Sequence, residues 1–254
     1  MFEDLIALCL AGSRPALQQD WWLAFSLAPA TLVPLLAWLA WLLVHRRRRW
    51  PLLGWGLLVL ALVSPLCRLA ATLAVAHMAQ LMALVAGMAL LALGSPPRAH
   101  MPRPGPAALA HGLLLWLWHV PALYSAVLLS APLHLLALAL LLGSAWWFWR
   151  AVLLAPTPWR GSALLALLAT MAHTGLLGAL LTFAGQPLYP LQAAGARAWG
   201  LEPLQDQQLA GLLMWVLGAL GYLLVAVALA LRWFGGAATP AVQRRGISAS
   251  ARLP

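Results

Sequence analysis

Four histidines lie inside or at the edges of long apolar segments of this 254-residue chain. They are His77, His119, His134 and His173, each on a different segment, while all five carboxylates avoid these segments. An ionisable side chain in a membrane-spanning helix is costly, so it indicates a functional site. Four imidazoles on four apolar segments therefore predict a polar or metal site inside a membrane bundle. The other three histidines (His45, His100 and His111) fall in inner loops or near the inner end of a helix, and we leave them out of this site.

Methionines accompany these histidines. Met78 follows His77, Met82 shares a helix face with Met78, and Met214 lies in the last apolar segment. Imidazole with thioether suits a soft cation such as Cu(I) better than calcium or magnesium, which prefer oxygen ligands. Methionine is also ordinary membrane core. The candidate metal ligands are His77, Met78, His119, His134 and His173.

The composition defines the class of protein. The chain is 64% hydrophobic and 8% charged, with a mean hydropathy of +0.89. No soluble domain of this length could bury so much apolar surface, so the sequence predicts an all-α polytopic membrane protein. The net charge of +10 does not indicate nucleic-acid binding, because the arginines cluster at segment ends. No catalytic triad can be assembled, since the acids lie in loops or at helix ends, and we expect no enzyme.

Runs of about 20 apolar residues predict seven spans. They lie near 22–44, 50–67, 72–94, 107–129, 132–154, 162–184 and 208–232. Pro121 is expected to kink or end the regular part of the fourth span, because proline removes a backbone donor. We expect three parts: an outer N-terminal segment (1–21), a seven-helix transmembrane domain (22–235) and a disordered cytoplasmic tail (236–254). The acidic start, with Glu3 and Asp4, makes a cleaved signal peptide unexpected.

The arginines orient these spans. With the N-terminus outside and the C-terminus in the cytoplasm, twelve of fifteen arginines fall on the inner side, where positive charge accumulates. The inner set is Arg46, Arg47, Arg48, Arg49, Arg98, Arg103, Arg150, Arg160, Arg232, Arg244, Arg245 and Arg252, and the outer set is Arg14, Arg68 and Arg197.

Three further features have a structural and a functional interpretation. Asp206 opens the last span and is either the N-cap of that helix or an anionic group near His134. Cys9 and Cys67 both fall on the outer side, where they could pair, serve as soft ligands or stay free. Glycines at 175, 178, 211, 218 and 221 are expected to let helices approach closely.

Several segments together resemble the CtaG family of cytochrome c oxidase assembly factors. They are SPLCRLAATLAVAHMAQ (64–80), LWLWHVPALYSAVL (115–128), PLH (132–134), HTGLLGALLTFAGQPLY (173–189) and LQDQQLAGLLMW (204–215), in the family's order over about residues 20–235. The resemblance implies a seven-helix protein of the bacterial inner membrane that serves haem-copper oxidase subunits and handles copper.

The chain departs from the family pattern at ligand-type positions. Leu81 stands where the family's HMxQH motif has its second histidine. Ala137 and Leu138 replace the glutamate and second histidine of HxLEH, and Cys67 stands where an aspartate is common. Two i, i+4 histidine pairs are thus reduced to single histidines.

Several functions remain open. The leading one is a non-enzymatic factor that receives copper at the outer face and passes it to an oxidase subunit. In it, His77, Met78 and His134 form an upper site, with His119 and His173 below. The alternatives are a metal-free structural partner of oxidase assembly, a small-cation transporter, and a haem-binding bundle with His77 and His173 as axial ligands. The sequence does not specify the oxidase or the oligomeric state.

Overall fold

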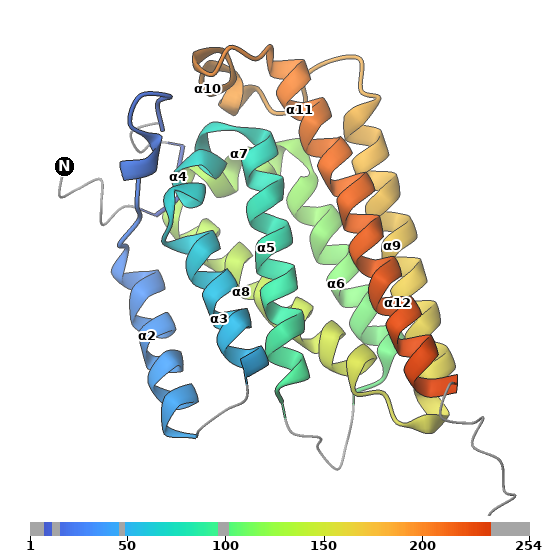
Figure 1. Ribbon diagram of the computed structural model, residues 1–254. Helices are drawn as coiled ribbons and strands as arrows, with labels where there is room; N and C mark the ends of the chain where they lie inside the picture. The colour runs from blue at the N-terminus through green and yellow to red at the C-terminus, as the bar shows by residue number, and fades with distance from the viewer. Residues whose placement is uncertain (1–7, 12–15, 46–48, 96–101, 235–254) are drawn as a thin grey trace, which may run out of the picture.

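The computed structural model describes residues 8–11, 16–45, 49–95 and 102–234. All regular elements within these ranges are helical, and they form a bundle whose long helices run roughly side by side (Figure 1). The predicted tail 236–254, His100, and the arginines at 14, 46–48, 98, 244, 245 and 252 lie outside the described residues.

Apolar helices make up the bundle. In chain order they are α2 (Pro29–Val44), α3 (Arg49–Leu62), α4 (Pro65–Thr72), α5 (Ala74–Leu93), α6 (Pro104–His119), α7 (Pro121–Leu129), α8 (Ala131–Leu153), α9 (Arg160–Thr182), α10 (Ala193–Ala198), α11 (Pro203–Leu212) and α12 (Gly218–Phe234). A π-helical turn, Leu213–Leu217, joins α11 to α12. Figure 1 shows α4, α7, α10 and the start of α11 at one end of the bundle.

Two helix pairs are bent at prolines. α6 and α7 meet at 79° beside Pro121, which confirms the expected break. α3 and α4 meet at 49°, where the Ser64 side chain accepts a hydrogen bond from the Leu66 amide at 3.2 Å. The predicted span 50–67 ends at the wrong residue. The first helix of this pair, α3, ends at Leu62, and the second, α4, continues five residues beyond the predicted end, to Thr72.

Helix length decides which segments can cross a membrane. Four helical stretches are long and apolar enough (Ala74–Leu93, Ala131–Leu153, Thr157–Thr182 and Pro203–Phe234), and six are if each bent pair is one span. Within the predicted first span, 22–44, the α-helix begins only at Pro29, so α2 has 16 residues. At 1.5 Å per residue it is about 24 Å long, short of a hydrocarbon core of about 30 Å. The protein is a multi-pass membrane protein, and the count of seven spans stays a prediction.

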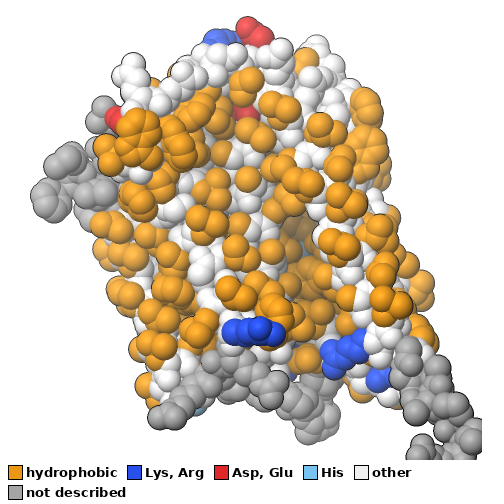
Figure 2. All heavy atoms as spheres, viewed as in Figure 1, with side chains coloured by type: hydrophobic (Ala, Val, Ile, Leu, Met, Phe, Trp, Pro, Cys, Tyr) orange, Lys and Arg blue, Asp and Glu red, His pale blue; other side chains and the backbone are white. Residues whose placement is uncertain are grey.

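Positive charge gathers at one end of the described bundle. Arg49, Arg103, Arg150, Arg160 and Arg232 lie at helix ends on one side, and the arginines in view in Figure 2 lie mostly at the lower end. The guanidinium of Arg103 lies 5.4 Å from the ring of Trp159, and that of Arg160 lies 5.6 Å from Trp233. Such pairs suit a membrane interface, where aromatic rings and positive charge both accumulate.

Glycines bring two helix pairs close together. A Cβ on Gly178 of α9 would lie 2.8 Å from the Gly211 carbonyl oxygen of α11, and one on Gly54 would lie 2.7 Å from the Gly87 carbonyl. No side chain fits at these distances, so the close approach of α9 to α11 and of α3 to α5 requires glycine.

Candidate metal site

A small cavity near the α4–α7 end of the bundle collects three of the predicted histidines. It has a volume of about 70 Å³, and its wall includes His77 of α5, His119 of α6 and His134 of α8. His119 and His134 are buried, and His77 is partly buried. The bend at Pro121 ends α6 directly after His119.

His119 has a defined tautomer. Its Nδ1 lies 2.6 Å from the Leu115 carbonyl oxygen, which only accepts, so Nδ1 carries the proton. Its Nε2 lies 3.5 Å from the sulfur of Met78, which is fully buried. An imidazole whose N–H is held by a backbone carbonyl presents the other nitrogen as a metal ligand. The structure therefore pairs one imidazole nitrogen with one thioether.

His77 and His134 each have a ring nitrogen without a partner. The Nδ1 atoms of both are buried and make no hydrogen bond to the described residues. The same rings are hydrogen-bonded to backbone groups, His77 at Ala70 and His134 at Val127. Buried nitrogens without a partner are rare in native structures, and an ion or a water would satisfy them.

A pair of tyrosines lies beside the cavity. The ring of Tyr124 is 4.9 Å from that of His77 and stacks on Tyr189 at 4.1 Å. The Tyr189 hydroxyl donates to the His119 carbonyl at 3.1 Å, and burial raises the pKa of this phenol, so it keeps its proton. The Tyr124 hydroxyl donates to Gln192 at 2.9 Å. Sequence reasoning missed these groups, because tyrosine near a membrane interface is unremarkable.

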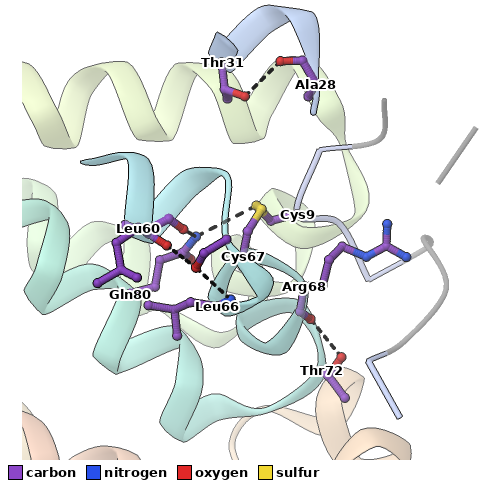
Figure 3. The surroundings of a disulfide bond; sticks show 11 residues. Cys9, Ala28, Thr31, Leu60, Leu66, Cys67, Arg68, Thr72 and Gln80 are labelled. Carbon is purple, nitrogen blue, oxygen red and sulfur yellow. Dashed lines mark hydrogen bonds between the residues drawn. A yellow bond between two sulfur atoms is a disulfide. The ribbon is translucent and has the colours of Figure 1, made fainter. Parts of the chain in front are cut away.

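Gln80 connects the cavity with a disulfide bond. It lies three residues from His77 and lines the same cavity. Its amide nitrogen donates to the Ala61 carbonyl at 2.8 Å and lies 3.8 Å from the Cys9 sulfur. Cys9 is bonded to Cys67 at the start of α4 (Figure 3). Of the three possibilities for these cysteines, the structure has the pair.

Asp206 caps a helix other than its own. The N-cap of its own helix α11 is Glu202, which forms a capping box with Gln205. The Asp206 carboxylate instead accepts from the amides of Ala74 at 2.7 Å and Val75 at 3.0 Å. It therefore caps α5, the helix of His77, and it is buried. The predicted cap on its own helix is wrong, because a residue one turn further back fills that position.

Three of the four positions that depart from the family pattern line the cavity. Leu81, Ala137 and Leu138 all line it together with the three histidines. Two helices thus present apolar side chains at positions one turn from His77 and His134.

His173 lies apart from the other three histidines. It lines a separate groove between α6 and α9, where its Nδ1 accepts from the Trp116 indole at 3.4 Å. The fully buried His111, which sequence reasoning left out, bonds Ser144 at 3.1 Å from Nδ1. The structure brings together His77, Met78, His119 and His134 but not His173.

The candidate ligands do not form a closed cage. Within the described residues, no three His, Cys, Asp or Glu side chains are grouped closely enough to hold a metal ion. The tightest soft pair is His119 with Met78. The cavity wall thus contains three imidazoles, and one of them, that of His119, contacts the buried sulfur of Met78.

Together these observations define a multi-pass helical membrane protein with an imidazole-lined cavity near one end of its bundle. The family model of the cytochrome c oxidase caa3 assembly factor (Caa3_CtaG) matches residues 92–235, more than half of the chain. The chain therefore belongs to this family of cytochrome c oxidase assembly factors. The matched region includes His119 and His134, whereas His77 and Met78 precede it. No curated protein and no solved structure matches the chain.

Proposed function

We propose that this protein is a non-catalytic assembly factor that holds Cu(I) and passes it to a subunit of a haem-copper oxidase. The observation that carries the proposal is the buried pair of His119 Nε2 and Met78 sulfur, 3.5 Å apart. A second and third imidazole lie in the same cavity wall, each with a buried nitrogen that makes no hydrogen bond to the described residues.

The donor set favours Cu(I) over other cations. Thioether and imidazole are soft or borderline ligands, whereas Mg²⁺ and Ca²⁺ require several oxygen ligands. The cavity wall contains no carboxylate among the described residues. Cu(I) accepts few ligands, so an open arrangement of one pair and two nearby imidazoles suits an ion that must be released again.

The proposal includes an orientation. We place the histidine cavity on the outer side of a bacterial plasma membrane, because the arginine-rich helix ends lie at the opposite end of the bundle. The disulfide near the cavity fits an oxidising compartment on that side.

A copper titration of the purified protein in detergent tests the proposal. The unsubstituted protein is expected to retain one Cu(I) against a competing chelator. His119→Ala and Met78→Leu are expected to lower its affinity by about tenfold or more, since ligand loss leaves a pair incomplete. His45→Ala is the matched control, because His45 is exposed and bonds only within its own helix turn. Equal copper retention in all variants would contradict this site.

A metal-free structural partner of oxidase assembly is the second candidate. It is favoured by the apolar side chains of Leu81, Ala137 and Leu138 in the cavity wall. In that case the unsubstituted protein retains no copper in the titration, yet it still supports oxidase assembly.

A further inference from the structure

The groove between α6 and α9 is separate from the proposed copper site. It has a volume of about 490 Å³ and shares no wall residue with the histidine cavity. Its walls include Gly105, Gly112 and Trp116 of α6 and Ser162, Ala169 and His173 of α9. Three further wall residues, Leu109, Leu113 and Leu165, are 62–70% exposed. The groove is therefore open along its side, and in a membrane it faces the bilayer.

The length of the groove matches the hydrocarbon of one leaflet. Its wall extends from Gly105 to Trp116 on α6 and from Ser162 to His173 on α9, which is the same rise of eleven residues on each helix. At 1.5 Å per residue this rise is about 16 Å. Half of a hydrocarbon core of about 30 Å is about 15 Å. The groove thus runs from one membrane surface to about the middle of the bilayer.

A hydrogen-bonded pair of side chains lies at the deep end of the groove. The Trp116 indole N–H donates to His173 Nδ1 at 3.4 Å, which joins α6 to α9. The His173 ring also lies against the backbone of α6, because a Cβ on Gly112 would be only 2.8 Å from its Nε2. This pair marks the point at which the groove ends.

The shallow end of the groove has an arginine between the two helices. Arg103 is the N-cap of α6, and its guanidinium lies 5.4 Å from the ring of Trp159, the N-cap of α9. The Arg103 side chain is exposed. Arg160, the first residue of α9, instead lies 5.6 Å from Trp233 of α12. The positive charge at the mouth of the groove is therefore that of Arg103.

Negative charge lies at the opposite end of the described bundle. The three described carboxylates, Asp20, Glu202 and Asp206, lie beside α4 or at the start of α11. The red side chains in view in Figure 2 are all toward the top, whereas most arginines in view are toward the bottom. An anion is thus attracted to the mouth of the groove, and arginine binds phosphate well. In a membrane, the headgroups of anionic phospholipids carry such charge at this depth.

We propose that the groove between α6 and α9 binds one anionic phospholipid, with its headgroup phosphate on Arg103 and one acyl chain along the groove as far as the Trp116–His173 pair. An apolar groove one leaflet long below a positive charge matches the two parts of such a lipid. On the proposed orientation, the lipid belongs to the cytoplasmic leaflet. The proposal does not depend on copper binding.

Lipid titrations of the full-length protein in detergent, followed by native mass spectrometry, test the headgroup contact. The probes are a phosphatidylglycerol and a phosphatidylcholine with the same acyl chains. One phosphatidylglycerol is expected to bind more tightly than phosphatidylcholine. Arg103→Gln is expected to lower the phosphatidylglycerol affinity about fivefold, the usual effect of one basic residue near an anionic surface.

Arg232→Gln is the matched control for the headgroup contact, because Arg232 is an exposed arginine at the same end of the bundle but on α12. It is expected to leave the affinity unchanged. Equal losses in Arg103→Gln and Arg232→Gln would show unspecific attraction to this end of the protein and would overturn the proposal. Equal affinities of the unsubstituted protein for the two lipids would overturn it as well.

Filling the groove tests the acyl-chain contact. Ala169→Phe places a large side chain about halfway along the groove and is expected to lower the phosphatidylglycerol affinity about tenfold. Ala172→Phe is the matched control, because Ala172 is exposed on the same helix and does not line the groove. Thermal unfolding without added lipid checks that both variants fold. An unchanged affinity in Ala169→Phe, or an equal loss in Ala172→Phe, contradicts binding in the groove.

Discussion

The imidazole of His119 is oriented by its own helix. Its N–H is bonded to the Leu115 carbonyl one turn earlier, which holds the opposite nitrogen toward the sulfur of Met78. The Tyr189 hydroxyl bonds the carbonyl of His119 itself, at the point where Pro121 ends the helical hydrogen-bonding pattern. The proline break thus frees a carbonyl that a distant loop then binds.

The two leucines that replace family histidines allow a test at the same scale. Leu81→His and Leu138→His place a second imidazole one turn from His77 and His134, inside the cavity wall. If the protein handles copper, the Cu(I) affinity is expected to rise by about tenfold or more in each variant, because two nitrogens then face one ion. Competition with a Cu(I) chelator measures the change.

Leu136→His is the control for this prediction. Leu136 lies on α8 two residues from Leu138 and is 50% exposed, so its imidazole points away from the cavity. An unchanged copper affinity in Leu81→His and Leu138→His, together with a lower thermal stability, would favour the metal-free structural partner, since a buried imidazole without a partner is costly.

At the scale of elements, α11 holds the start of α5. The Asp206 carboxylate binds two amides of the first turn of α5, which begins three residues before His77. The first amides of a helix have no partner within it, so a buried helix start needs an acceptor from elsewhere. Here the acceptor comes from a helix more than 130 residues later in the sequence.

Removal of this cap is expected to destabilise the protein. Asp206→Ala leaves the buried Ala74 amide and the partly buried Val75 amide without an acceptor and is expected to cost about 2 kcal/mol. Asp206→Asn keeps one acceptor oxygen and is expected to cost less. Thermal unfolding in detergent measures both. Equal stability of Asp206→Ala and the unsubstituted protein would show that the cap is dispensable.

Local signals in the sequence predicted where helices lie and break, but they predicted poorly which helices contact one another. Pro121 marked the bend between α6 and α7, because the effect of proline on a helix is local. The start of α2 was misplaced, since residues 22–28 are as apolar as the helix that follows. The meeting of His77, His119 and His134, the separate position of His173, and the capping of α5 by Asp206 all depend on how helices pack. No single segment encodes that packing.

At the scale of the whole molecule, the arginine distribution predicts a topology that gene fusions can test. Alkaline phosphatase folds only outside the cytoplasm, so a fusion after residue 235 is expected to be inactive. A fusion at a residue within 186–204 is expected to be highly active. The reverse pattern would contradict the orientation, and equal activity at both sites would contradict a single membrane crossing between them.

On the proposed topology, the disulfide bond between Cys9 and Cys67 can form only at a defined stage of membrane insertion. Its partners are 58 residues apart, and on the proposed topology the chain crosses the membrane inward and back between them. At bacterial translation rates, Cys9 waits outside for roughly 3 to 12 s before Cys67 arrives. During that interval the emerging N-terminal segment has a free thiol in an oxidising compartment. Closure of the bond then marks the moment at which the first membrane hairpin is complete.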